Sequence, residues 1–264
     1  MTEVSANSYL NGIFGLEGKT AALTGAGGFL VGELSRGLAR AGVKVALLDA
    51  NEDNAKAGAA EIELGGGRAI AVRVDVTKKA ELEAALSAVI DNYGAVDVLV
   101  NGAGINAPTP FFDIRVEEWN RILEVQLTGT MLGCQVFGSH MVERGQGSIV
   151  NISSASAGPP LSKAFAYSVA KAGVKNLTQN LAREWATSGV RVNALRPGFF
   201  PTEWSKENFL SPERIEAILG HTPMGRFGEP RELVGAVLWL CSDAAGFVTG
   251  AEIPVDGGFS AMSI

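Results

Sequence analysis

Tyr167 and Lys171 lie four residues apart in a stretch expected to be helical, and together they could do acid–base chemistry. Side chains at this spacing share one face of a helix, so the phenol and the ammonium would project side by side. A neighbouring ammonium favours the phenolate and lowers a phenol pKa that is ordinarily about 10. Tyr167 would then be a usable general acid or base near neutral pH. Taken alone, the pair is better explained as two residues on a solvated helix face, so the rest of the chain must decide.

The elements that must position this pair follow a regular alternation. Short apolar runs alternate with segments of helical periodicity, which predicts a parallel sheet covered by helices on both faces. No linker, repeat or low-complexity tract interrupts the pattern, so a single domain over residues 1–264 is expected, with an N-terminal arm at 1–15 and a less regular, lid-like stretch at 199–228. The expected strands are 19–24, 43–48, 69–74, 96–100, 148–152, 190–195 and 252–255, and the expected helices are 28–41, 51–64, 78–92, 116–143, 165–187 and 230–241.

Composition narrows the classes of protein further. The 264 residues are 47% hydrophobic and 19% charged, which suits one α/β domain with a sizeable core and argues against disorder. The net charge is −6 and Lys and Arg do not cluster, so a nucleic-acid partner is not expected. With only Cys134 and Cys241, both in expected helices, a disulfide framework is improbable and the cytoplasm is the simpler setting.

Several kinds of segment and site are not expected. No apolar run approaches the roughly 18 to 20 residues that a membrane-spanning helix needs. The N-terminus carries Glu3 and no sustained apolar run, which argues against a signal peptide. The two histidines, His140 and His221, have no Cys or carboxylate at ligand spacing, so no metal site is predicted.

A glycine-rich turn, Gly25-Ala26-Gly27-Gly28, joins the first expected strand to the following helix. Such a turn lets backbone N–H groups approach a pyrophosphate at a helix N-terminus, although an ordinary tight turn has the same composition. Asp49 ends the second expected strand, where a carboxylate can accept hydrogen bonds from an adenosine ribose. A carboxylate there repels a 2′-phosphate, and the next residue is Ala50 and not arginine, so NAD is favoured over NADP. Asp49 could instead serve only to cap the next helix.

These features occur together with several further motifs in a fixed order. From about Leu16 to its C-terminus the chain resembles the short-chain dehydrogenase/reductase family. The resemblance implies a single-domain Rossmann fold, a doubly wound parallel sheet of seven strands with helices on both faces, and NAD as cofactor. It also implies a homotetramer paired through the helices at 116–143 and 165–187. The motifs that carry it are Thr24-Gly25, Asp75-Val76, Asn101-Gly102-Ala103-Gly104, Asn151-Ile152-Ser153-Ser154, Tyr167-Ser168-Val169-Ala170-Lys171, and Arg196-Pro197-Gly198 with Thr202.

The resemblance also assigns roles to residues. Ser154 has the family's spacing to Tyr167, so Ser154 would hold the substrate oxygen and Tyr167 would exchange a proton with it, while Lys171 would bind the nicotinamide ribose and keep the phenol acidic. Asp75 and Val76 would flank the adenine, Asn101 would line the cofactor cleft and Thr202 would meet the carboxamide. The full expected cofactor set is Thr24, Gly25, Gly27, Gly28, Phe29, Leu30, Asp49, Asp75, Val76, Asn101, Ala103, Gly104, Tyr167, Lys171, Pro197, Gly198, Phe200 and Thr202.

The sequence departs from the family pattern at two places. Phe29 and Val31 stand where the family loop has its second and third glycines, and a β-branched side chain at Val31 is expected to push the helix outward or shift its start unless nearby glycines at 27, 28 and 32 compensate. Gln126 stands in the long helix where the family commonly has an asparagine that helps to hold a water in the proton relay. Gln126 is counted with the catalytic residues here, in a relay that is rearranged or weakened; a helix-packing glutamine is the alternative.

Within the family, the chain is most similar to enzymes of sugar acids, of the gluconate 5-dehydrogenase and fructuronate reductase (mannonate oxidoreductase) kind. This likeness is carried by the Gly-Gly-Phe-Leu loop at 27–30, the stretch 221–230 and the tail 255–260. A sugar acid or polyol is therefore the expected substrate, and a carboxylate would favour a cation near the cleft. The substrate candidates are Lys163, with Trp204 and Phe199 as parts of a closing lid; Lys206, His221 and Arg226 are further cations in or after that lid. A 3-oxoacyl-thioester reductase and a non-catalytic dinucleotide-binding scaffold are the alternatives.

Overall fold

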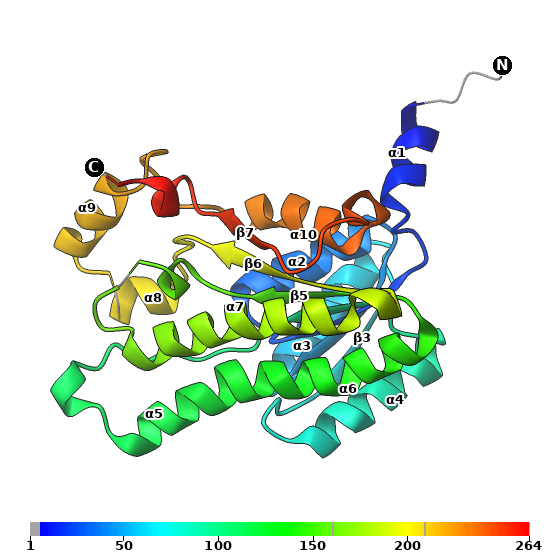
Figure 1. Ribbon diagram of the computed structural model, residues 1–264, viewed down its shortest axis with the longest axis horizontal. Helices are drawn as coiled ribbons and strands as arrows, with labels where there is room; N and C mark the ends of the chain where they lie inside the picture. Colours follow the sequence, from blue (N-terminus) through cyan, green and yellow to red (C-terminus); the bar gives the residue numbers. More distant parts are fainter. Residues whose placement is uncertain (1–5, 160, 209, 264) are drawn as a thin grey trace.

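The computed structural model describes residues 6–159, 161–208 and 210–263, without the side chains of residues 6–8, 203, 204 and 208. One sheet of seven parallel strands runs through the molecule in the order β3-β2-β1-β4-β5-β6-β7 (Figure 1). The strands are β1 Thr20–Thr24, β2 Lys44–Asp49, β3 Ala69–Arg73, β4 Val98–Asn101, β5 Gly147–Ile152, β6 Val190–Pro197 and β7 Glu252–Val255. The seven-stranded doubly wound sheet predicted from the sequence is confirmed.

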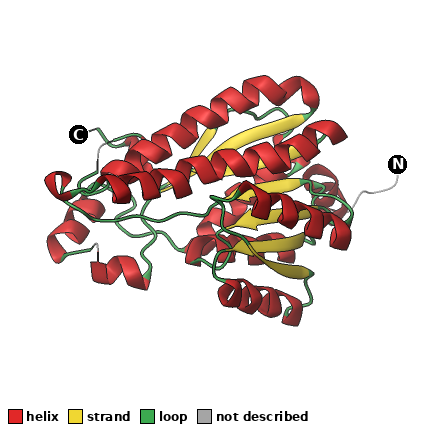
Figure 2. Cartoon of the chain, turned by 90° about the horizontal axis from the view of Figure 1, so that it is seen from below, coloured by secondary structure: helices red, strands yellow, loops and turns green. Residues whose placement is uncertain are grey.

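Helices cover both faces of this sheet (Figure 2). The α-helices are α1 Ala6–Phe14, α2 Phe29–Arg40, α3 Glu52–Leu64, α4 Lys79–Tyr93, α5 Val116–Leu123, α6 Gly129–Arg144, α7 Phe165–Trp185, α8 Glu203–Asn208, α9 Pro212–Gly220 and α10 Val234–Cys241. A π-helical turn, η2 Glu124–Thr128, joins α5 to α6, and the short 3₁₀ turns are η1 Phe111–Asp113, η3 Ala155–Ala157, η4 Ala186–Ser188, η5 Pro230–Leu233, η6 Asp243–Ala245 and η7 Phe259–Ala261.

Two apolar cores form because successive side chains of a strand point to opposite faces. In β2, Val45 and Leu47 pack into the core shared with α2, α3 and α10, whereas Ala46 and Leu48 pack into the core shared with α4 and α6. All four are fully buried. This burial on both faces explains why the strands have continuous apolar sequences.

The sheet's strand order reverses beside β1, which pairs with β2 on one side and β4 on the other. Ligands of open α/β sheets bind at such a switch point, outside the carboxyl ends of the strands. Thr24, Asp49 and Asn101 end β1, β2 and β4, so the fold brings these predicted site residues to one edge.

Two segments differ from the sequence predictions. The N-terminal arm contains the helix α1, which projects from the body in Figure 1 and contacts η6. The stretch 199–228, expected to be the least regular, contains α8 and α9. Ser211 begins α9 by accepting a hydrogen bond from the Arg214 amide at 3.3 Å, and Pro212 occupies the first turn; together they form an ordinary helix start.

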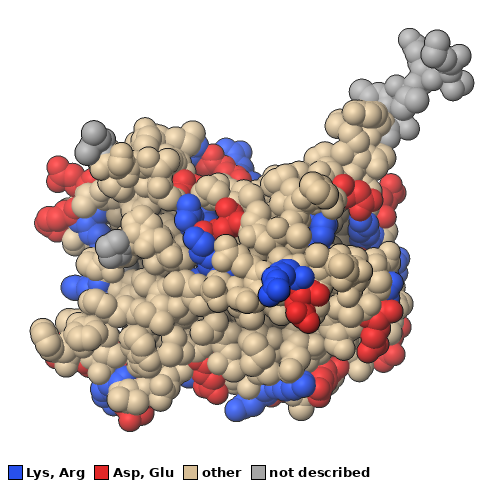
Figure 3. All heavy atoms as spheres, viewed as in Figure 1, with Lys and Arg blue, Asp and Glu red and all other residues tan. Residues whose placement is uncertain are grey.

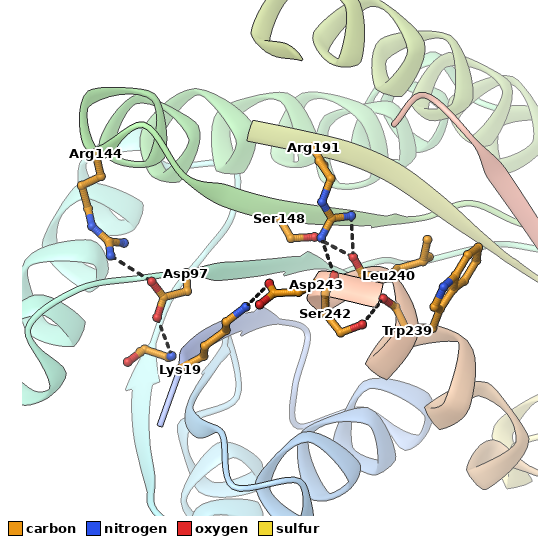
Figure 4. Close-up of polar contacts among 10 residues, drawn as sticks. Lys19, Asp97, Arg144, Ser148, Arg191, Trp239, Leu240, Ser242 and Asp243 are labelled. Atoms are coloured by element: carbon orange, nitrogen blue, oxygen red, sulfur yellow. Dashed lines mark hydrogen bonds and ion pairs between the residues drawn. The ribbon is translucent and has the colours of Figure 1, made fainter. Parts of the chain in front are cut away.

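Polar contacts also lie at the amino ends of the strands (Figure 4). Arg191 donates to the carbonyls of Leu240 at 2.9 Å and Ser242 at 3.0 Å, and Lys19 pairs with Asp243 at 2.8 Å. These bonds tie the end of α10 and η6 to β6 and to the residue before β1. These contacts hold α10 against the sheet, and we assign them a structural role.

On the face seen in Figure 3, basic and acidic side chains are interspersed, without a basic patch over any one element. Within the described ranges, no helix is both long enough and apolar enough to cross a membrane. The same residues contain no group of three His, Cys, Asp or Glu side chains that could hold a metal ion.

Candidate active site

The glycine turn after β1 has the backbone that the sequence predicted for a phosphate-binding loop. Gly25 has φ of +74°, and a Cβ there would lie 2.6 Å from the Cα of Ala103, so only glycine fits. Gly28 is the N-cap of α2 in an extended conformation, and the helix starts at Phe29. The first N–H groups of a helix have no partner within it and attract anions. The turn therefore presents amides to the cleft at the switch point.

Val31 does not need the compensation that the sequence suggested. Its side chain is 5% exposed, and α2 begins directly after Gly28. A Cβ on Gly102 would overlap Cγ2 of Val31, so the missing side chain at Gly102 gives Val31 its space. The absence of a side chain at Gly102, after β4, thus allows the close approach of α2 to the sheet at Val31. Phe29, at the other departure, is half exposed at the edge of the cleft.

Asp49 lies where a ribose-binding carboxylate is expected. One of its oxygens accepts from the Gly27 amide at 2.9 Å and the other from the Asn51 amide at 2.8 Å. These bonds fix the carboxylate at the mouth of the glycine turn. The helix α3 is capped by Asn51, whose side chain accepts from the Asn54 amide at 3.1 Å, so Asp49 is not the cap of that helix.

Asp75 follows β3 on the other side of the same cleft. Burial tends to raise the pKa of Asp75, but two hydrogen bonds from Thr77 and the positive charges of Arg121 and Lys78 outweigh it, and the net pKa is lowered. Asp75 is therefore ionised at neutral pH, facing a cavity of about 400 Å³. That cavity is lined by Gly25, Gly28, Phe29, Leu30, Val31, Asp49, Ala50, Val74, Asp75, Val76, Gly102, Ala103, Gly104, Ile105, Arg121, Val125 and Thr202.

This cavity fits a dinucleotide, because its walls include a cradle at Gly25 that any Cβ would fill and amides at the start of α2. It contains most of the cofactor residues expected on the adenosine side. Thr24 supports the cavity from behind: its hydroxyl accepts from the Gly102 amide at 3.1 Å and its side chain is buried. Ile105 and Arg121 also line it and were not predicted, because nothing in their spacing marks them.

Asn101 does not line the cleft as predicted. Its amide nitrogen donates to Asn151 at 2.9 Å and to the sulfur of Cys134 at 3.3 Å, and Asn151 in turn donates to Thr178 at 3.0 Å. All four side chains are buried. The prediction is wrong because the side chain turns inward beneath the sheet edge, where it ties β4 to β5 and α6. The residues after it, Gly102 to Ile105, line the cleft instead.

Ser154, Tyr167 and Lys171 come together as the resemblance implied. Ser154 follows β5 and begins η3, which packs against α7. Its hydroxyl accepts from the Ser156 amide at 3.2 Å and from the Ser156 hydroxyl at 3.1 Å, and it lines the same cavity as Tyr167. Lys171, one turn after Tyr167 on α7, has its Nζ 5.6 Å from the centre of the phenol ring. Lys171 donates to the carbonyl of Ile152 at 2.6 Å. Lys171 therefore joins the catalytic helix to the end of β5, beside Ser154 and Tyr167.

The pKa of Tyr167 differs from the sequence expectation. Burial raises it, the hydrogen bond with Ser154 lowers it by less, and the net pKa is above the usual value. Burial also lowers the pKa of Lys171 to about 7. The prediction that Lys171 lowers the phenol pKa is thus wrong for the protein groups alone, because Lys171 is itself 4% exposed and only partly charged at neutral pH.

Gln126 lies in the π-helical turn and is 2% exposed. Its Nε2 donates to the carbonyl of Ile105 at 2.8 Å, and its backbone carbonyl accepts from Thr130 at 2.7 Å. A Cβ on Gly104 would lie 2.5 Å from Gln126 Nε2, so the amide packs directly on the loop that lines the cofactor cleft. The extra methylene therefore brings Gln126 to that loop, and its hydrogen-bond partners are not members of the Ser154–Tyr167–Lys171 group.

A second cavity, of about 260 Å³, adjoins the first at Leu30 and contains the catalytic hydroxyls. Its remaining walls come from the residues after β5 and β6 and from α8 and α9. Phe199, a predicted substrate residue, lines it and packs edge-on against Phe259; Pro197, Gly198 and Phe200, which were predicted to bind the cofactor, line the same cavity. The lining is Leu30, Asn106, Ile152, Ser153, Ser154, Ser156, Leu161, Ala164, Tyr167, Pro197, Gly198, Phe199, Phe200, Pro201, Ser205, Leu210 and Arg214.

The cations predicted near the substrate lie elsewhere. Lys163 is exposed, has φ of +55° and does not line the cavity. Arg226 pairs with Glu232 at 2.7 Å, and His221 packs against Phe259. The side chain of Trp204 lies outside the described residues. Arg214, which was not predicted from the sequence, lines the cavity. It lies in the first turn of α9, and no motif or spacing in the sequence marks it as a binding residue.

Comparison with known proteins identifies the family of this chain. A family model described as Enoyl-(Acyl carrier protein) reductase matches residues 32–260. The chain belongs to the short-chain dehydrogenase/reductase family. It is 40% identical to galactitol 2-dehydrogenase (L-tagatose-forming) of Cereibacter sphaeroides, over 94% of this chain and 97% of that protein.

Two solved structures of this family are similar throughout. The gluconate 5-dehydrogenase of Burkholderia cenocepacia J2315, in complex with NADP and tartrate, is 33% identical with a TM-score of 0.89, covering 94% of this chain and 97% of that one. A protein of Haemophilus influenza provisionally assigned as a D-mannonate oxidoreductase, with bound NAD, is 36% identical with a TM-score of 0.86, and the same shares are covered. The chain is therefore an oxidoreductase of this family.

Proposed function

We propose that this short-chain dehydrogenase/reductase interconverts a secondary alcohol and a ketone on a sugar acid or polyol, with NAD as cofactor. The observation that carries the proposal is the pairing of the Ser154 and Tyr167 hydroxyls in one cavity, one helical turn from Lys171. Two hydroxyls that line one cavity can both contact a single substrate oxygen. Non-catalytic scaffolds have no need for this arrangement.

Each side chain has a distinct task in the reaction. Ser154 holds the substrate oxygen, and Tyr167 exchanges a proton with it. Because burial raises the pKa of Tyr167, the phenol is protonated at neutral pH and is set to donate in the direction of ketone reduction. Lys171, with a pKa of about 7, is the nearby group whose charge favours the phenolate in the direction of alcohol oxidation. The nicotinamide, when bound, supplies or accepts the hydride.

NAD is the cofactor we favour. The Asp49 carboxylate is fixed by two backbone amides at the ribose end of the cleft, and Ala50 offers no positive charge to a 2′-phosphate. Among the similar structures, the gluconate 5-dehydrogenase contains NADP and the Haemophilus protein contains NAD, so relatives of similar fold use both. Initial rates with each dinucleotide at equal concentration decide between them.

The substrate class rests on the relatives. Galactitol is a polyol, gluconate and mannonate are sugar acids, and each names a relative that matches nearly the whole chain. The cavity beside Ser154 mixes hydroxyl groups with apolar walls, which suits a short polyhydroxylated chain. The thioester alternative is tested in the same assay.

The homotetramer and the cytoplasmic setting remain proposals. Phe111, Phe112 and Phe165 form an exposed aromatic cluster beside α5 and α7, and Val116 and Val169 extend it over both helices. An exposed apolar surface of this kind suits the pairing of these helices between subunits. Light scattering at micromolar concentration gives the oligomeric state.

The proposed reaction is tested by NAD reduction with a panel of aldonates, polyols and 3-hydroxyacyl thioesters, with wild type and Tyr167→Phe. We expect turnover of aldonates or polyols by wild type and a loss of about 100-fold or more in the variant, the usual scale for a general acid or base. Turnover confined to the thioesters would refute the substrate class. Equal rates for wild type and variant would remove Tyr167 from the mechanism.

A further inference from the structure

Within the described part of the chain, the lining of the substrate cavity includes one charged side chain, Arg214. The others are apolar residues, hydroxyls and one amide. A guanidinium surrounded largely by apolar walls loses hydration, and burial lowers the pKa of Arg214 accordingly. An anion bound beside the guanidinium compensates the hydration that Arg214 has lost.

Arg214 is held in place from the loop that precedes the catalytic helix. Its Nη1 donates to the hydroxyl of Ser162 at 2.7 Å and its Nη2 to the carbonyl of the same residue at 3.2 Å. These two bonds fix the plane of the guanidinium relative to the segment that leads to Tyr167 on α7. They also join α9 to the wall of the cavity that contains Ser154 and Tyr167. An arginine fixed in this way presents a planar donor group of the geometry that carboxylates accept.

The position of Arg214 in its own helix does not favour helix stability. It lies in the first turn of α9, where the N–H ends of the peptide dipoles are exposed. A cation near a helix N-terminus is unfavourable for the helix. Glu213 supplies a negative charge in the same turn of α9, and Arg214 is the residue of that turn that lines the cavity.

We propose that Arg214 binds the carboxylate of the substrate and makes this enzyme prefer a sugar acid over the corresponding polyol. This inference rests on the proposed function, because it places the reacting carbinol at Ser154 and Tyr167 in the same cavity. The acid end of the substrate then lies toward α9 and the alcohol end toward α7. Lys163, the cation expected from the sequence, has no part in this recognition.

The test compares two substrates that differ only at one end, D-gluconate and D-glucitol. KM and kcat are measured with NAD for wild type, Arg214→Gln, Arg214→Lys and the control Arg40→Gln, an exposed arginine at the far end of α2. We expect Arg214→Gln to raise KM for gluconate about 10- to 100-fold, the scale of a lost charge-assisted hydrogen-bond pair, with little change for glucitol. Arg214→Lys keeps the charge and loses the planar pair of donors, so its KM for gluconate should lie between those of wild type and Arg214→Gln. The KM of Arg40→Gln should equal that of wild type.

The outcomes separate this proposal from the one it rests on. If wild type oxidises neither of these substrates nor any other aldonate or polyol of the panel, the proposed function fails, and the assignment of Arg214 fails with it. If wild type oxidises glucitol but not gluconate, or if Arg214→Gln changes both substrates equally, the proposed function stands and the role of Arg214 is refuted. Thermal unfolding of each variant, together with its KM for NAD, shows that a selective loss with gluconate is not a loss of fold. Should Arg214→Gln fail to fold, the ratio of the two KM values in Arg214→Lys decides the question.

Discussion

The fit between Gly102 and Val31 can be tested by a pair of substitutions at the base of the cofactor cleft. In Gly102→Ala the new methyl overlaps Cγ2 of Val31 and lies 3.2 Å from the carbonyl oxygen of Thr24 and 3.3 Å from Cγ1 of Ile152. Overfilling a close-packed site typically costs about 1–3 kcal/mol of unfolding free energy. Gly102 does not have a positive φ, so the cost comes from packing and not from backbone strain.

Val31→Ala removes the side chain that the new methyl meets. Alone, it loses two buried methyl groups, about 1.6 kcal/mol at about 0.8 kcal/mol each, and leaves a small cavity. In the double variant the methyl introduced by Gly102→Ala fills part of that space. The two effects should therefore be less than additive, by about 1 kcal/mol or more, as is usual for residues in contact.

The assay is denaturant unfolding of wild type, both single variants and the double variant at one protein concentration, since any oligomer makes stability depend on concentration. For a chain of this size, 1 kcal/mol corresponds to about 2–4 °C in Tm, so thermal scans provide an independent measure. KM for NAD should rise with Gly102→Ala and recover in part in the double variant. The reasoning would be refuted if Gly102→Ala had the unfolding free energy of wild type, or if the losses of the two single variants added up to that of the double variant. Either result would show that the absence of a side chain at Gly102 is not what accommodates Val31.

Three further results are expected. Because burial lowers the pKa of Lys171 to about 7, the unfolded chain binds a proton that the folded chain does not between about pH 10 and pH 7, so wild type loses stability as the pH falls through this range. As the pH falls, the Tm of Lys171→Met relative to that of wild type should therefore rise over the same range and become constant below about pH 7. A Tm difference that is the same at every pH would contradict the burial of a titrating amine. Gln126→Asn should lose the bond to Ile105 and raise KM for NAD about fivefold, on the scale of one hydrogen bond, whereas a fall in kcat at constant KM would restore the relay role expected from the sequence. Ser162→Ala should loosen Arg214 and raise KM for gluconate several-fold, less than Arg214→Gln does, and an unchanged KM would show that the clamp is dispensable.

Most of the elements could be predicted from the sequence because their signals are local. The apolar runs and the helical periodicity place the strands and helices within a few residues of their observed bounds. Parallel strands bring their carboxyl ends to one edge, so Asp49 and Ser154 could be expected near the cleft once the topology was predicted. The helix α1 was missed because it is short, begins in a polar stretch and lacks a run of apolar residues long enough to signal it.

The residues that the sequence misplaced are those whose side chains could turn either way. Asn101 follows a strand in the expected place, yet its amide points inward to Asn151 and not to the cleft. Gln126 reaches Ile105 because a π-helical turn rotates that part of the long helix, and no local pattern predicts such a turn. Lys163 and Arg214 are both cations near the lid, and only the packing of α9 decides which one lines the cavity.

The sequence by itself determined the family, the approximate positions of the strands and the identity of the Ser154, Tyr167 and Lys171 group, since these depend on residue types at fixed spacings along the chain. The tertiary structure decided the pKa directions of Tyr167 and Lys171, the fit of Val31 against Gly102 and the place of Arg214. These properties depend on burial and contact between segments far apart in sequence. Dehydration of a charge and the overlap of two side chains arise only when the elements have packed.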